Sequence, residues 1–206
     1  MKFREKITIK NVSLERELIF LMGARAPEES AKLSISDQVF MAAESIAETP
    51  QIYVSYPKEL KTSLMPHVAH LPWLAEEAYE GIRVRGRFPK YGIDIDENQI
   101  LLESPIPVAY KRQKGCYPGQ EVIERISAYG KGRTPTTLCL LSCEGQHDFS
   151  ASSPLLSGDQ AAGHITSCVF DPLTEKTWVL GYVEQKFIAP NMEFQISSQK
   201  AELFFD

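Results

Sequence analysis

The last third of the sequence is a series of short, apolar, β-type stretches, and this pattern limits the possible folds more than any other feature of the chain. Clusters of Gly, Pro, Asp and Ser separate the stretches, as turns separate the strands of an antiparallel sheet. Short strands at this spacing are typical of a small barrel or sandwich. We therefore predict a β-barrel here, with strands at residues 137–142, 162–170, 177–183, 192–196 and 201–205.

The first two thirds of the chain mix strand and helix patterns. Apolar residues alternate with charged ones at the start of the chain, and short apolar runs follow, as in strands. Proline in a first turn, followed by acidic residues, favours the start of a helix. We predict strands over residues 2–10, 17–22 and 52–56, and helices from residue 27, over 57–65 and over 72–83.

Both the pattern and the charge of the sequence change near Thr134. The net charge is −2 over residues 1–79, +3 over 80–133 and −6 over 134–206, which gives −5 for the chain. An acidic C-terminal part and a basic centre argue against binding of duplex DNA but leave room for a local anion site. The sequence predicts an α+β fold with two domains, residues 1–134 and 135–206.

Length and cysteine content indicate a cytoplasmic protein. A chain of 206 residues buries enough surface to fold without disulfides, and its four cysteines are too scattered for a secreted disulfide framework. Charged residues interrupt the first ten positions, where an export signal would be apolar. The longest apolar run near the front, residues 18–22, is far shorter than the ~20 residues that span a bilayer. No membrane association is expected.

The most informative segment, residues 111–125, surrounds Cys116. Gly115 and the Pro118-Gly119 pair predict a tight turn, and the apolar spacing after Gln120 predicts a helix over residues 120–128. Cys116 should therefore lie just before a helix, where unpaired N–H groups and the helix dipole favour a thiolate. Read as a lone cysteine, Cys116 would more commonly be a small buried hydrophobe in a turn.

The string around Cys116 is KGCYPGQE, residues 114–121, with Arg125 four residues later. It resembles the signature of the YgfZ family, folate-binding-like proteins that support iron-sulfur enzymes and tRNA thiomodification. That signature reads Lys-Gly-Cys-aromatic-x-Gly-Gln-Glu, with an Arg shortly after. Residues 163–167, GHITS, and 181–183, GYV, resemble strands of the family's C-terminal barrel. The resemblance implies a ferredoxin-like α+β domain followed by that barrel.

Residues 83–97, RVRGRFPKYGIDIDE, resemble a stretch of the related glycine-cleavage T-protein, an aminomethyltransferase that uses tetrahydrofolate. The resemblance implies a folate-type ligand site. Arg85 stands where that pattern has an acidic pterin-binding residue, and a guanidinium can only donate hydrogen bonds, which argues against the usual pterin pose. By this resemblance, we expect the chain to lack a counterpart of the family's first segment, which carries the catalytic Asp of the T-protein. The expected cofactor-site residues are Arg83, Arg85, Tyr91, Asp94, Gly115 and Gly119.

These resemblances imply an accessory protein for iron-sulfur cluster assembly or maintenance, with Cys116 as its functional thiol. A single thiolate does not hold a cluster alone, so any cluster contact would be transient or shared with cluster carriers or client enzymes. Lys114 and Arg125 would stabilise an anionic sulfur, Tyr117 would wall the site, and Gln120 would orient it. Glu121 completes the expected functional set.

Two further functions stay open from the sequence. One is a tetrahydrofolate-dependent aminomethyltransferase or a folate sensor, and the other is a non-catalytic interaction scaffold. The edge of the strand expected at residues 2–10 is unpaired and could be completed by a partner or a second copy of the chain.

The remaining candidate ligands have simpler interpretations. Cys139, Cys143 and His147 are spaced four apart, but a closed zinc site needs a fourth ligand, so we expect two core cysteines and a surface histidine. Cys168 lies in an apolar strand and is also expected in the core. No metal site is predicted. Arg83, Arg85 and Arg87 form either a solvated basic face or an anion site.

Overall fold

The computed structural model describes residues 8–46, 48–104, 106, 115–129, 133–190 and 192–204, without the side chain of residue 129. The chain forms two compact units, residues 1–73 and 74–206. Among the described residues, no helix has both the length and the apolar character needed to cross a membrane.

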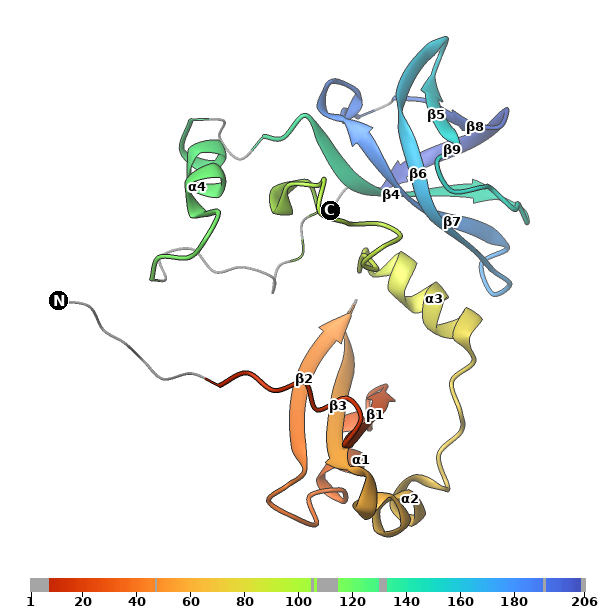
Figure 1. Cartoon of the computed structure of the whole chain (residues 1–206). Helices are drawn as coiled ribbons and strands as arrows, with labels where there is room; N and C mark the ends of the chain where they lie inside the picture. Colours follow the sequence, from red (N-terminus) through yellow and green to blue (C-terminus); the bar gives the residue numbers. More distant parts are fainter. Residues whose placement is uncertain are drawn as a thin grey trace, which may run out of the picture. The chain divides into compact units, whose positions relative to one another are not determined.

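The first unit is built on a three-stranded antiparallel sheet in the order β1-β3-β2 (Figure 1). The strands are β1 (Arg16–Met22), β2 (Phe40–Ile46) and β3 (Thr49–Pro57). Helix α1 (Ala26–Ala31) has a proline in its first turn, and the short turn η1 (Lys58–Leu60) leads into α2 (Lys61–Val68). The apolar face of the sheet packs with both helices in one core that includes Leu33, Val54 and Leu64.

The second unit contains a closed six-stranded antiparallel barrel in the order β4-β7-β6-β5-β8-β9, with β9 pairing back onto β4 (Figure 1). Alternate residues of its strands fill the interior, among them Leu141, Leu155, Ile165 and Phe194, at most 1% exposed. The short turn η3 (Gln185–Phe187) follows β7. The strands are β4 (Thr136–Glu144), β5 (Pro154–Ser157), β6 (Gln160–Asp171), β7 (Lys176–Glu184), β8 (Phe194–Ile196) and β9 (Gln199–Phe204).

Helix α3 (Glu76–Arg85) belongs to the same unit as the barrel and covers part of its outer surface. Val84 is fully buried there in a second core, which includes Leu138, Trp178 and Leu180. A short turn, η2 (Leu101–Glu103), follows, and helix α4 (Gln120–Tyr129) comes next along the chain. Helix α3 therefore packs on the barrel although it precedes the first barrel strand, β4, in the sequence.

The α+β class and the C-terminal barrel predicted from the sequence are confirmed, as are the strands and helices predicted within the described residues apart from the one at the N-terminus. The sequence missed β2 and β5. The barrel begins beside the expected boundary at Thr134, yet the compact units divide between Trp73 and Leu74, because α3 packs on β6 and β7. Of the strand expected at residues 2–10, only Thr8, Ile9 and Lys10 are described, and they have no regular structure.

Candidate functional site

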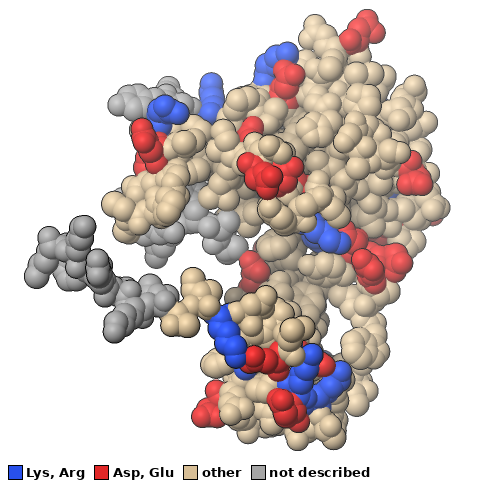
Figure 2. Space-filling model, viewed as in Figure 1, with Lys and Arg blue, Asp and Glu red and all other residues tan. Residues whose placement is uncertain are grey.

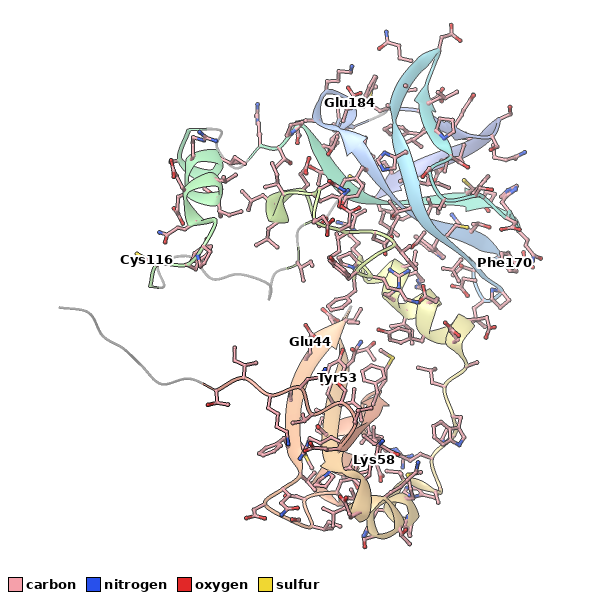
Figure 3. All side chains as sticks on the ribbon, viewed as in Figure 1. Glu44, Tyr53, Lys58, Cys116, Phe170 and Glu184 are labelled. Atoms are coloured by element: carbon pink, nitrogen blue, oxygen red, sulfur yellow. The ribbon has the colours of Figure 1, made fainter. Side chains whose placement is uncertain are left out.

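Cys116 lies on an irregular turn that leads directly into α4 (Figure 3). Gly119 has a φ of 84°, a left-handed conformation that glycine adopts without strain. The Gln120 backbone N–H donates to the Tyr117 carbonyl at 3.2 Å, and the Gln120 side-chain oxygen accepts from the Tyr117 N–H at 3.4 Å. Gln120 therefore closes the turn through its backbone and its side chain, and Cys116 is exposed at its start.

The rest of the KGCYPGQE segment surrounds this turn. Gly115 and Glu121 are exposed, and so is Arg125 one turn along α4, while Tyr117 and Gln120 are half-buried. Ile123 is 7% exposed and is the buried residue within 120–128 of this helix. Lys114, with Lys111 and Arg112, lies outside the described residues.

The other three cysteines have a different environment. Cys139 and Cys143 are buried in the barrel core, and Cys168 packs against it, as the sequence predicted. Burial raises the pKa of Cys139 and of Cys143 to about 11 and also raises the pKa of Cys168. A high pKa leaves these thiols protonated and unreactive at neutral pH. Among the four cysteines, Cys116 is the one that solvent reaches freely.

Arg83 of α3 and Asp94 of the following loop form a buried ion pair, and both bond Ser167 on barrel strand β6. Arg83 is 2% exposed and donates to Asp94 at 2.6 Å, to Glu80, to the Phe88 carbonyl and to Ser167. Burial acts to lower the pKa of Arg83, but the hydrogen bonds and charges of Glu80 and Asp94 outweigh it, so the pKa is raised. All five guanidinium N–H groups have acceptors, and none remains for an external anion.

Asp94 is saturated in the same way. Its carboxylate accepts from Arg83, from the Lys90 N–H at 2.8 Å, and from the hydroxyls of Thr166 and Ser167. Its backbone carbonyl accepts from the Tyr182 hydroxyl at 3.0 Å. The structure thus joins three segments that the sequence singled out separately, residues 83–97, 163–167 and 181–183.

Arg85 and Arg87 are also engaged with the barrel. Arg85, about half exposed, donates to Asp171 at 3.0 Å and lies over the Trp178 ring. Arg87 donates to the Phe204 carbonyl at 3.1 Å. The three arginines therefore point to separate acceptors and do not form one basic face. On the face in Figure 2, acidic and basic side chains are interspersed.

Neither Arg85, which stands at the expected pterin-binding position, nor the buried Asp94 offers a free carboxylate to a pterin edge. Arg85 is donor-only, and both oxygens of Asp94 are occupied by buried donors. Tyr91 is 71% exposed on the loop that follows α3. These positions form a structural joint within the unit, and their fit to tetrahydrofolate is poor.

The spacing of Cys139, Cys143 and His147 does not produce a metal site. The His147 ring stacks on Phe149, and its Nε2 lies 2.7 Å from the Glu144 carbonyl oxygen. Within the described ranges, no three His, Cys, Asp or Glu residues are placed to hold a metal ion.

The sequence missed Glu103, Ser104 and Thr136, which complete the buried joint. Tyr182 shares a 2.6 Å hydrogen bond with Ser104, and Thr136 donates to Glu103 at 2.7 Å. The hydroxyl residues of the GHITS segment were a signal that could have been used, since buried hydroxyls need polar partners.

No protein-family profile matches the sequence, and no curated protein matches it. A solved structure does: the glycine cleavage system aminomethyltransferase T from Bartonella henselae superimposes with a TM-score of 0.73 at 15% identity. The match covers 93% of this chain and 58% of that protein. The fold is therefore that of a T-protein-like domain with its small barrel, and the chain spans little more than half of the neighbour's length.

Proposed function

We propose that the protein is an accessory factor for iron-sulfur cluster assembly or maintenance that acts through the Cys116 thiol. The observation that carries this proposal is the position of Cys116, exposed on a turn ordered by Gln120, while the other three cysteines are held in or against the barrel core. The resemblance of residues 114–121 to the YgfZ signature supports the class of function. A role in tRNA thiomodification belongs to the same proposal, because it too depends on sulfur chemistry.

The cluster would be cargo and not a resident group. Iron-sulfur clusters are commonly held by four thiolates, and Cys116 is the one exposed thiol of this chain. Further ligands would therefore come from a cluster carrier or a client enzyme. The charged groups beside the turn, Arg125 and Glu121, would then face the partner that brings them.

Complementation of a strain that lacks the protein tests this role. We expect extracts of the strain that carries Cys116→Ala to lack the activity of cluster-dependent enzymes. Extracts of the strain that carries Cys168→Ala, which removes a thiol packed against the barrel core, should retain that activity. Immunoblots should give equal amounts of both variants. Full rescue by Cys116→Ala would contradict the proposal.

The alternative is a tetrahydrofolate-dependent aminomethyltransferase or a folate sensor, and the fold shared with an aminomethyltransferase favours it. Against it are the engaged Arg85 and Asp94. Isothermal titration with tetrahydrofolate separates the two functions. We expect no binding to the wild type, and Arg85→Glu tests whether a carboxylate restores it. Stoichiometric binding to the wild type would favour the alternative.

A further inference from the structure

A surface cavity of about 190 Å³ lies in the second unit, and none of the described residues of α4 lines it. One wall is the loop of residues 92–96 with Gln99, and the other is residues 151–152 with β6, while Tyr182 of β7 also lines it. The proposed role of Cys116 does not use this cavity.

Buried hydrogen bonds hold the loop of residues 92–96, which forms the first wall of the cavity. Asp94 is fixed by its bonds to Arg83, Thr166 and Ser167, and its carbonyl accepts from Tyr182. Tyr91 and Ile95 form a β-bridge across the loop. A wall ordered before binding loses little conformational freedom when a ligand arrives, and this favours affinity.

The cavity has a negative character. Asp96 is exposed and lines it, and its Oδ1 accepts from the Asn98 N–H at 2.7 Å, which orients the carboxylate. Neither Lys nor Arg is among the described lining residues, and neighbouring Lys90 is paired with Glu80. Burial raises the pKa of Tyr182, and the charges of Glu103, Asp94 and Asp96 raise it further.

Aromatic and apolar groups accompany the carboxylate. The rings of His164 and Tyr182, both of which line the cavity, stack with their centroids 5.6 Å apart. Ile93 lines the cavity and is 51% exposed, and Tyr91 two residues before it is 71% exposed. A planar cation can lie on an aromatic face while it donates to a carboxylate, and a guanidinium suits both contacts better than an ammonium.

We propose that this cavity receives the arginine side chain of a partner protein, with Asp96 as the anionic acceptor and the exposed His164 ring, which stacks on the buried Tyr182, as the flat surface. The exposed Tyr91 and Ile93 favour a protein over a free small molecule, because they extend the contact to apolar residues that flank the arginine. Aromatic and apolar anchors around a buried charge are typical of protein interfaces.

Amide NMR titration of the full chain tests the proposal with three probes: Nα-acetyl-arginine methylamide, the matching citrulline compound and an acetylated Leu-Arg-Leu amide. We expect saturable shifts at Gly92, Gln99, Ala151 and Ser152. The neutral citrulline compound should bind roughly tenfold more weakly or worse, because charged groups form the stronger hydrogen bonds. The leucine-flanked peptide should bind more tightly than the single residue.

Two variants and a control make the test specific. Asp96→Asn should abolish the shifts, and Ser152→Lys should block the cavity with its own cation. Asp159→Asn removes an exposed carboxylate from the turn between β5 and β6 and should change nothing. An equal response to arginine and citrulline, no saturable shift up to about 20 mM, or wild-type binding by Asp96→Asn would overturn the proposal. Tighter binding of free arginine than of the peptide would overturn the partner-protein assignment.

Discussion

The four cysteines of the chain show how local environment decides which side chain is available for chemistry. Cys139 and Cys143 lie on a barrel strand, where burial raises the pKa of each thiol to about 11. Cys116 precedes a helix and faces solvent. The same residue type therefore serves as core packing at one position and as a candidate functional group at another.

Thiol labelling provides a direct check of this difference. In the native protein at neutral pH, iodoacetamide should modify Cys116 alone on a time scale of minutes, since the thiolate is the reactive form and the other thiols are protected by burial. In denaturant all four cysteines should react. Peptide mass spectrometry identifies the modified residue, and native labelling of Cys139 or Cys143 at the rate of Cys116 would contradict the prediction.

The buried pair of Arg83 and Asp94 should matter more for stability than the pair that half-exposed Arg85 forms with Asp171. Arg83→Met leaves the buried Asp94 without its counter-charge, which costs about 3–5 kcal/mol of the free energy of unfolding. Arg85→Gln, the matched control, removes a half-exposed pair and should cost about 1 kcal/mol or less. Urea denaturation measures both. Equal losses for the buried and exposed pairs would contradict this assignment.

Among the elements, the barrel strands β6 and β7 depend on two glycines. A Cβ at Gly163 would collide with the Tyr182 backbone carbonyl, and one at Gly181 would lie 2.8 Å from the His164 carbonyl oxygen. Both positions fall in segments whose resemblance to known barrel strands was visible in the sequence. Close backbone approach is the physical reason for glycine at these two sites.

Alanine substitution at two glycines should therefore have opposite effects. Gly163→Ala should lower the free energy of unfolding by about 1–3 kcal/mol, because the backbone must shift to relieve the collision. Gly81→Ala in α3, where a Cβ meets nothing within 4 Å, should raise it by about 0.5–1 kcal/mol through helix propensity. Thermal and urea unfolding check both values, and stabilisation by Gly163→Ala would refute the packing argument.

The elements also show what the sequence could and could not predict. Strongly patterned strands such as β7 were found because a continuous apolar run between turns has few other interpretations. β2 was missed because its sequence, FMAAESI, contains two Ala and a Glu, residues depleted in strands, and becomes a strand through pairing with β3. β5 has only four residues, too few for a pattern.

The candidate site also has features that the sequence predicted and features that it did not. The turn and helix around Cys116 followed from local Gly and Pro residues and from apolar spacing. Arg83 was expected among ligand-binding residues, but the structure gives it buried partners at Glu80, Asp94 and Ser167. Its bond to Ser167, which lies 84 positions further along the chain, has no signal in a single sequence.

At the scale of the whole molecule, the two units have separate cores. The interior of the barrel and the packing of α3 on its outer surface lie entirely within residues 74–206. The core of the first unit lies within residues 1–73. The folding of each unit can therefore be tested in a fragment that lacks the other unit.

We expect a fragment of residues 74–206 to fold without the first unit. Its far-ultraviolet circular dichroism should retain the β signal, and its amide spectrum should be dispersed, because both of its apolar cores are complete. A fragment of residues 1–73 should be less stable, since chains of this size bury a smaller fraction of their surface. An unfolded 74–206 fragment would show that the barrel depends on the first unit.

The closure of the barrel has a consequence for synthesis of the chain. β4 is the first barrel strand to leave the ribosome, but one of its two neighbours is β9, the last strand of the barrel to be translated. Until β9 emerges, one edge of β4 has no neighbour from the barrel and can pair with other nascent chains. Translation rate and chaperone supply during this interval should therefore determine the yield of correctly closed protein.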